Sequence, residues 1–371
     1  MFDINILKSE EKAIFSLRAL YDKYGYKPYK MSKFEEYALY SRNMDFLVSR
    51  NIITFNDTDG RLLALKPDVT LSIIKNSKDE PGYVQKVYYN ENVYRVSPRT
   101  HTFREIMQTG LECIGDIDIY NIIEVINLAA ESLSVISDEF VLDISHMGIL
   151  SALIDECTGD KELKKQIAAF FPQKNAHDMM LLCRENNVPE SAYMNLCRFM
   201  GIYGDMGTVV EKLGDICTKG KAKDSYDELK LIYSLLCGTK FEKNIHFDFS
   251  TANDMNYYNG IVFKGFIENI PDSVLSGGRY DTLMHKMGRN SGAIGFAVYL
   301  DVLEQIKTSS PEFDADVLVL YDRNTDTKEL IKKVNELAQS GLSVTAQKSV
   351  PEKLRYKRIV NLTERSTSDN D

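Results

Sequence analysis

Strand-forming segments lie on both sides of a long helical stretch, and this order limits the folds that the chain can adopt. Before residue 139, short segments rich in β-branched, aromatic and aliphatic residues are bounded by turn signals such as 57–60. From about 149 to 239 the hydrophobic period becomes that of helices, and strand signals resume at 245–249 and 260–267. The chain is therefore predicted to be an α+β fold with a helical insertion.

Six or seven antiparallel strands with flanking helices are expected around that insertion. The strands before it are predicted at 52–55, 62–65, 83–89 and 139–144. Helices are predicted at 9–24 and 122–133, the first with Ser9 as its N-cap and Gly25 as a left-handed C-cap.

A second, smaller unit is expected near the C-terminus. The sequence at 308–311 has the composition of a linker, and strands at 317–321 and 342–346 flank a helix at 327–339. A further strand is predicted at 355–362. The predicted organisation is thus a core at 1–307, with its insertion at 149–239, a small α/β unit at 312–363, and a disordered polar tail at 364–371.

Charge and cysteine content narrow the possible partners. The chain has 371 residues, a net charge of −9 and six cysteines. An acidic balance disfavours a large nucleic-acid surface, so tRNA binding is not expected. The cysteines form no C-x-x-C pair, which predicts free thiols and no metal site. Without a signal peptide or a membrane span in the sequence, the protein is expected to be cytoplasmic.

Several polar and aromatic residues predict one binding site, of a kind that could hold a small amino acid and a nucleotide. Gln108 and Glu112 lie four apart, a spacing that shares a face on either a helix or a strand. An amide and a carboxylate on one face can hold an ammonium group or an imidazole N–H. The other candidates add a carboxylate, a hydroxyl, a cation and an aromatic wall with phenolic donors: Asp68, Thr70, Arg95, Tyr257 and Tyr258.

These residues also have structural alternatives. Tyr257 and Tyr258 could be ordinary strand residues that pack on both faces of a sheet, and Gln108 and Glu112 could be surface residues. Asp68 follows Pro67 and is also suited to cap a helix at 69–75, and the two roles are compatible. Arg279 and Asp281 could form an ion pair with each other instead of contacting a ligand. Gly277 and Gly278 would let the backbone approach a ligand closely.

The segments that contain these residues resemble the motifs of class II aminoacyl-tRNA synthetases, and of histidyl-tRNA synthetase in particular. The resemblance covers about residues 5–305. It rests on four segments in the family's order: 65–70 (LKPDVT), 94–112, 256–260 (NYYNG) and 277–281 (GGRYD), with 293–297 (AIGFA) after them. It implies a homodimeric core, amino-acid-binding roles for the seven candidates named above, and supporting roles in the pocket for Arg279 and Tyr280.

Departures from the family's motifs predict that the site does not react. Asn253 and Val302 stand where the motifs carry arginines, and Asn256 stands in place of an aspartate. Tyr299 and Asp301 replace the glycine and glutamate of the last motif, and the loop after Arg95 is one residue short. Amino-acid adenylation develops charge at a phosphate, and losing one stabilising donor costs about 10²–10³ in rate. No catalytic residue and no cofactor are therefore predicted.

This combination resembles the regulatory subunits of ATP phosphoribosyltransferase, a family of synthetase paralogues. The resemblance implies a non-catalytic chain that assembles in a hetero-oligomer with a short-form catalytic subunit. Together they would perform the first step of histidine biosynthesis, with histidine as the feedback effector. The short C-terminal unit agrees with this interpretation.

Two alternatives remain from the sequence. An active histidyl-tRNA synthetase would show histidine-dependent ATP–pyrophosphate exchange. A stand-alone amino-acid sensor or tRNA-related accessory factor would not activate a phosphoribosyltransferase on mixing. Whether histidine occupies the synthetase-like pocket or a subunit interface is open at this stage.

Overall fold

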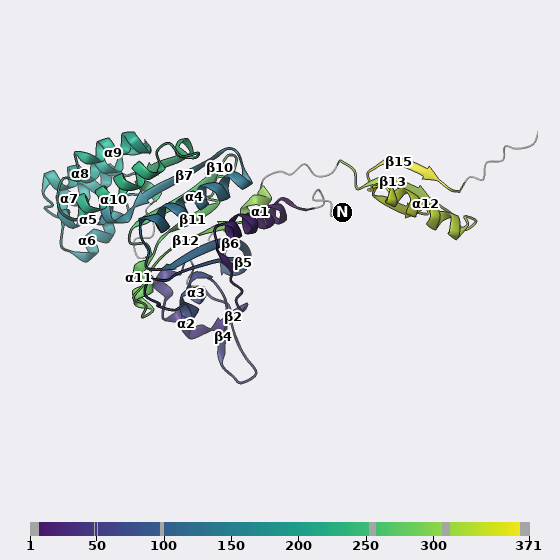
Figure 1. Ribbon diagram of the computed structural model, residues 1–371, viewed down its shortest axis with the longest axis horizontal. Helices are drawn as coiled ribbons and strands as arrows, with labels where there is room; N and C mark the ends of the chain where they lie inside the picture. The colour runs from purple at the N-terminus through teal and green to yellow at the C-terminus, as the bar shows by residue number, and fades with distance from the viewer. Residues whose placement is uncertain are drawn as a thin grey trace, which may run out of the picture. The chain divides into compact units, whose positions relative to one another are not determined.

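The protein divides into two compact units, Met1–Ile306 and Lys307–Asp371. A computed structural model describes residues 7–47, 49, 51–96, 100–251, 257–305 and 312–363 (Figure 1). The sequence features at Asn253, Asn256, 97–99, 308–311 and 364–371 lie outside these described residues.

The larger unit is built on a mixed sheet that, in the described part of the chain, has nine strands. Their spatial order is β1 (Lys27–Pro28), β5 (Val84–Val96), β6 (Phe103–Gly115), β12 (Gly292–Tyr299), β11 (Leu275–Arg279), β10 (Ile261–Ile267), β7 (Phe140–His146), β9 (Ile245–Asp248) and β8 (Tyr203–Asp205). The pairs β1–β5 and β7–β9 are parallel and the other pairs are antiparallel.

The predicted α+β arrangement of a sheet with flanking helices is confirmed, but the sheet is mixed, and the predicted number of six or seven strands is wrong. The segments predicted at 52–55 and 62–65 pair in a separate small sheet, and β6, β11 and β12 were not predicted as strands. The edges add β1, which has two residues, and β8, which has three. Segments this short carry no alternating pattern and form strands only because a longer neighbour supplies hydrogen-bonding partners.

One face of the sheet is covered by α1 (Ser9–Lys23) and α4 (Ile119–Ile136) (Figure 1). Leu17 and Tyr21 of α1 are fully buried, and the Tyr21 ring lies 6.1 Å from that of Phe296 on β12. Helix α4 is long and apolar enough to span a membrane by length and composition alone. Ten of its eighteen residues are buried, which is typical of a core helix packed on a sheet.

The opposite face holds a second hydrophobic cluster. It packs α3 (Thr70–Asn76) and α11 (Asp281–Lys286) against the sheet residues Tyr89, Ile114 and Ala293. A small antiparallel sheet and two short helical segments also contribute to this second cluster. The strands of the small sheet are, in spatial order, β2 (Phe34–Glu36), β4 (Leu62–Leu65) and β3 (Thr54–Asn56), and the helical segments are α2 (Tyr37–Ser41) and η2 (Met44–Phe46).

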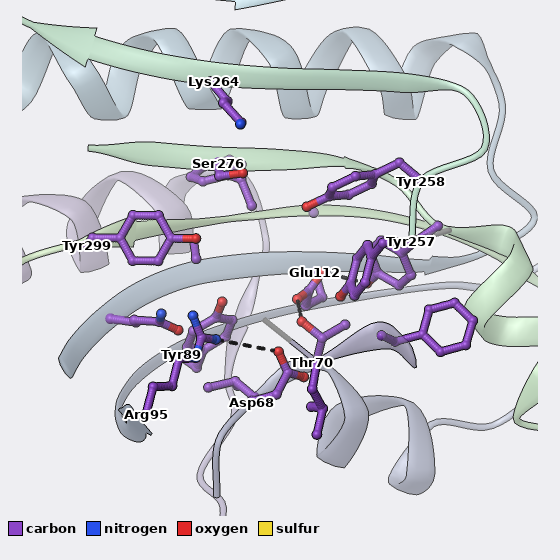
Figure 2. A pocket seen from close by; sticks show the side chains of 18 of the residues that line it. Asp68, Thr70, Tyr89, Arg95, Glu112, Tyr257, Tyr258, Lys264, Ser276 and Tyr299 are labelled. Atoms are coloured by element: carbon purple, nitrogen blue, oxygen red, sulfur yellow. Dashed lines mark hydrogen bonds and ion pairs between the residues drawn. The ribbon is translucent and has the colours of Figure 1, made fainter. Parts of the chain in front are cut away.

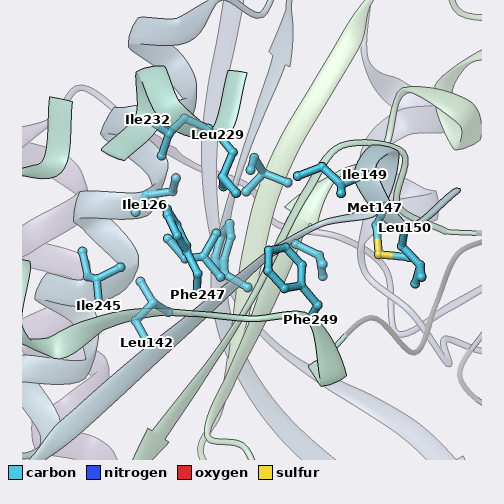
Figure 3. Close-up of a cluster of buried hydrophobic side chains, with 14 of the residues drawn as sticks. Ile126, Leu142, Met147, Ile149, Leu150, Leu229, Ile232, Ile245, Phe247 and Phe249 are labelled. Atoms are coloured by element: carbon cyan, nitrogen blue, oxygen red, sulfur yellow. The ribbon is translucent and has the colours of Figure 1, made fainter. Parts of the chain in front are cut away.

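The insertion between β7 and β9 is helical, and only the short strand β8 interrupts it among its described residues. Its helices are α5 (Met147–Cys157), α6 (Lys161–Ala168), α7 (Ala176–Glu185), α8 (Glu190–Met200), α9 (Met206–Gly214) and α10 (Gly220–Leu236). Ile149 of α5 and Leu229 of α10 join the core cluster that contains Phe247 of β9 (Figure 3). The insertion is therefore continuous with the core of the larger unit. All six cysteines are free thiols.

Several elements run further than the sequence pattern indicates. Helix α1 starts at Ser9 itself, so Lys8 is the N-cap, while Gly25 has the positive φ of 83° expected at a C-cap. Strand β5 was expected to end at 89 and continues to Val96. It does so because β6 pairs with it along all thirteen residues, which satisfies the backbone of its polar stretch.

The smaller unit has a three-stranded parallel sheet in the order β14 (Val344–Gln347), β13 (Ala315–Leu320), β15 (Tyr356–Asn361). Helix α12 (Thr327–Gln339) connects β13 to β14 and packs beside β14. Asp326 caps the start of α12 by accepting a hydrogen bond from the Lys328 N–H.

Candidate functional site

A pocket of about 300 Å³ lies on the α3 side of the larger unit's sheet (Figure 2). The volume is at the lower end of the range for small-molecule sites. All seven residues predicted as a binding site line this one pocket: Asp68, Thr70, Arg95, Gln108, Glu112, Tyr257 and Tyr258. They come from the start of α3, from β5 and β6, and from the segment before β10.

Two adjacent strands form the floor of the pocket. In the antiparallel pairing of β6 with β12, Gln108 faces Tyr299, Gly110 faces Ala297, and Glu112 faces Gly295. Alternate residues on a strand point to the same face, so these pairs share one side of the sheet. Leu111 and Cys113, on either side of Glu112, point into the core cluster on the other face.

Glycine is required beside Glu112. A Cβ atom on Gly295 would overlap the Glu112 carboxylate and the backbone oxygen of Leu111. Strand β12 therefore leaves the space that the carboxylate occupies.

Glu112 is the most perturbed acid in the pocket. Its side chain is 2% exposed, and it accepts hydrogen bonds from the Thr70 hydroxyl (2.8 Å) and the Tyr280 phenol. Burial raises the pKa of Glu112 to about 8, against the lowering effect of those two hydrogen bonds. The carboxyl is thus largely protonated at neutral pH in the empty pocket. A ligand that brings a cationic group or a strong N–H donor would favour its ionised form.

Asp68 accepts a hydrogen bond at the start of α3 and also lines the pocket. One carboxylate oxygen accepts a hydrogen bond from the Leu71 N–H at the start of α3 (2.9 Å), and the other lies 3.7 Å from the Arg95 guanidinium. Burial raises the pKa of Asp68, while Arg95 acts in the opposite direction. The residue caps the helix and also faces the pocket.

Arg95 is already engaged by the protein. Its Nε donates to the Pro67 carbonyl (2.7 Å), and its guanidinium also interacts with Asp68 and with the phenol of Tyr299. A guanidinium with these partners is poorly placed to stabilise a phosphate.

Tyrosines form one wall of the pocket. The rings of Tyr257 and Tyr258 lie 4.6 Å apart, and Tyr257 also packs 5.8 Å from Tyr280 and 6.1 Å from Phe46. Burial raises the pKa of Tyr257 and of Tyr280, so both phenols remain hydrogen-bond donors at neutral pH. Such a wall suits a flat ring that also carries an acceptor.

Arg279 and Val302 contribute differently. The Arg279 Nε donates to Asp281 (2.7 Å), and the guanidinium lies 4.0 Å from Glu228 of α10. The structure thus has the ion pair between Arg279 and Asp281 that the sequence offered as an alternative. Arg279 is not among the residues that line the pocket, whereas its neighbour Tyr280 is. Val302 packs against the main core cluster as an apolar residue.

Further pocket residues were not predicted as site residues, among them Tyr89, Lys264, Ser276 and Tyr299. Ser276 directly precedes the Gly277-Gly278 segment, and Tyr299 was recognised only as a departure from a motif. Lys264 and Tyr89 lie in strands for which the sequence does not specify which side chains point to the pocket face of the sheet. Register with neighbouring strands, which brings them to the pocket face, is a tertiary property.

The pocket as a whole brings together groups that can bind a small polar ligand with a flat ring. It joins two carboxyl groups, an aromatic wall and an amide in one small cavity. Within the part of the chain that the structure describes, no group of three or more His, Cys, Asp or Glu residues could hold a metal ion. The fold and site are those of a class II synthetase-like protein with an amino-acid-sized pocket.

The family follows from a comparison with known proteins. A model of the histidyl-tRNA synthetase family matches residues 6–303, so the chain belongs to that family. The ATP phosphoribosyltransferase regulatory subunit of Oceanobacillus iheyensis is 29% identical over 307 residues, which are 81% of this chain and 75% of that protein. The predicted resemblance to these regulatory subunits is confirmed.

Solved structures agree on the fold. An ATP phosphoribosyltransferase regulatory subunit/histidyl-tRNA synthetase from Bacillus halodurans superposes with a TM-score of 0.77 at 23% identity, covering 99% of this chain and 97% of that one. A chain of the ATP phosphoribosyltransferase complex from Thermotoga maritima gives a TM-score of 0.62 at 20% identity, covering 80% and 98%. The predicted class II synthetase-like fold is thereby confirmed.

Proposed function

We propose that this chain is the regulatory subunit of an ATP phosphoribosyltransferase and performs no phosphoribosyl transfer itself. Curated relatives that match this chain over most of their own length are named ATP phosphoribosyltransferase regulatory subunits. The Thermotoga maritima neighbour is part of such a complex. The expected partner is a short-form catalytic subunit, the expected arrangement is a homodimeric core within a hetero-oligomer, and the expected location is the cytoplasm.

The observation that carries the proposal is a binding pocket whose arginine is already engaged. Glu112, Thr70 and Tyr280 form a hydrogen-bonded group that can receive an N–H donor. Arg95, by contrast, is held by Asp68 and a backbone carbonyl, and Val302 is part of the hydrophobic packing. Adenylation requires fixed charge at the reacting phosphate, and this arrangement favours amino-acid binding without activation.

Histidine is the proposed ligand of this pocket. Its imidazole is flat and carries an N–H, which suits the wall of Tyr257 and the carboxyl of Glu112, while Asp68 can receive an ammonium group. A ligand bound here influences the partner only if the assembled complex has two states that bind histidine with different affinity. Histidine would then shift the complex toward the less active state.

Mixing purified subunits tests the function. The catalytic subunit from the same organism should form phosphoribosyl-ATP slowly alone and much faster with this chain, and added histidine should reduce the rate. A catalytic subunit that is fully active and histidine-sensitive by itself would refute the proposal. Histidine-dependent ATP–pyrophosphate exchange by this chain at the rate of a working synthetase would indicate an active synthetase instead.

A further inference from the structure

Lys264 of β10 is a cation at the edge of the pocket without a protein partner among the described residues. It lines the pocket, and it makes no hydrogen bond or ion pair with another residue that the structure describes. Figure 2 shows its side chain extending toward Ser276 on the neighbouring strand. A lysine that faces a pocket without a counter-charge indicates an anionic group of a ligand.

The nearest carboxylate by register does not neutralise this lysine. Asp143 lies opposite Lys264 in the β10–β7 pairing. The cations that act on Asp143 are His246, at 3.9 Å, and Lys174. Lys264 therefore turns toward the pocket.

A second unpaired donor faces the same cavity. Gln108 is 2% exposed, and its Nε2 has no hydrogen-bond partner in the described structure. Buried amide N–H groups are nearly always paired, so this one indicates a missing acceptor.

Lys264 and Gln108 approach the cavity from opposite sides. Strand β10 is separated from β6 by β11 and β12, which places the two backbones about 14 Å apart at the usual strand spacing. The side chains cannot meet across this distance, but each can donate to a small group bound between them. The Tyr299 phenol, which interacts with Arg95 and Ser276, lies on the same side of the sheet and reduces the space for anything larger.

We propose that Lys264 and Gln108 bind the carboxylate of the amino acid whose N–H groups face Asp68 and Glu112. This inference rests on the proposed function, because it concerns the ligand of the same pocket. It assigns the carboxylate to a lysine on β10 and leaves Arg95 in its internal contacts. The preferred ligands are then α-amino acids with a free carboxylate. Related amines and alcohols should bind more weakly.

Isothermal titration of the full chain with L-histidine and with L-histidinol, which lacks the carboxylate, tests the assignment. Lys264→Met should weaken L-histidine binding at least tenfold, as expected for loss of a charged hydrogen bond, and change L-histidinol binding less than threefold. Lys264→Arg should retain most of the affinity for L-histidine. Lys212→Met, an exposed position on α9, is the matched control and should leave both ligands unaffected.

The following results would overturn the assignment. They are equal losses for both ligands in Lys264→Met, unchanged binding of L-histidine in that variant, and no binding of L-histidine to the wild-type chain. Displacement of L-histidine by millimolar inorganic phosphate would also count against it, because the subsite would then be a general anion site. Activation of the catalytic subunit by the same preparations is measured in parallel. If activation persists while the assignment fails, only the carboxylate subsite is wrong.

Discussion

Replacing Glu112 with glutamine should stabilise the empty protein and do so increasingly as the pH rises. Burial raises the pKa of this carboxyl from 4.5 to about 8. Between these two values the folded protein binds a proton that the unfolded chain releases, so the free energy of unfolding falls as the pH increases. Glutamine keeps the size of the side chain and does not titrate.

The magnitude follows from the shift. At 1.36 kcal/mol per pKa unit, the raised pKa of Glu112 lowers the free energy of unfolding, relative to its value below pH 4, by about 3 kcal/mol at pH 7 and by up to about 5 kcal/mol above pH 8. The difference in unfolding free energy between Glu112→Gln and wild type should therefore grow by roughly 1.4 kcal/mol per pH unit between about pH 5 and 8, and then level off.

Urea unfolding of both proteins at a series of pH values measures this difference without ligand. Glu211→Gln, at an exposed position on α9, is the control and should show no such trend. A Glu112→Gln difference that stays constant from pH 5 to 8 would show that Glu112 ionises normally and would refute the reasoning. The same variant should bind histidine more weakly, because the ionised acceptor is lost.

Two further variants test the surroundings of the pocket. Gly295→Ala should destabilise the protein by about 1–3 kcal/mol in urea unfolding and weaken histidine binding, since a Cβ there overlaps the Glu112 carboxylate. Gly159→Ala is the control: Gly159 has open space around it, so this substitution should change stability by less than about 0.5 kcal/mol. Equal effects of the two substitutions would contradict the packing argument. Glu228→Ala should cost about 1–3 kcal/mol near neutral pH, because the Glu228 carboxylate lies 3.1 Å from Nε2 of the buried His146, whose Nδ1 accepts from the Gly148 N–H. The hydrogen bond to His146 lowers the pKa of Glu228, so this contribution should be present above the ordinary glutamate pKa and disappear as the pH falls below it; a loss that is the same at pH 3 and pH 7 would contradict it.

The sequence predicts the central part of the site well because the chemistry lies in short segments. Glu112 and Gln108 share a face whichever element contains them, and Asp68 with Thr70 lies at a helix start that proline and aspartate already indicate. The strand β10 and the helix α12 can also be predicted from sequence, because β10 begins with an apolar run of β-branched and aromatic residues and α12 has a helical hydrophobic period.

What the sequence misses depends on pairing between distant segments. The short strands β1 and β8 exist only beside β5 and β9, and the polar end of β5 is a strand only because β6 accompanies it. Lys264 reaches the pocket because β10 pairs with β11 in one register, and a shift by one residue would turn it to the opposite face. For Arg279 the sequence left a ligand role and an ion pair with Asp281 both open, and the structure pairs it with Asp281 and Glu228.

The most direct test of the proposed regulatory role is a titration of the catalytic subunit with this chain while phosphoribosyl-ATP formation is followed. We expect the rate to rise with added chain until the subunits reach a fixed ratio, and histidine to lower the plateau. A rate that does not depend on the added chain, with the catalytic subunit fully active alone, would contradict a regulatory role for this protein.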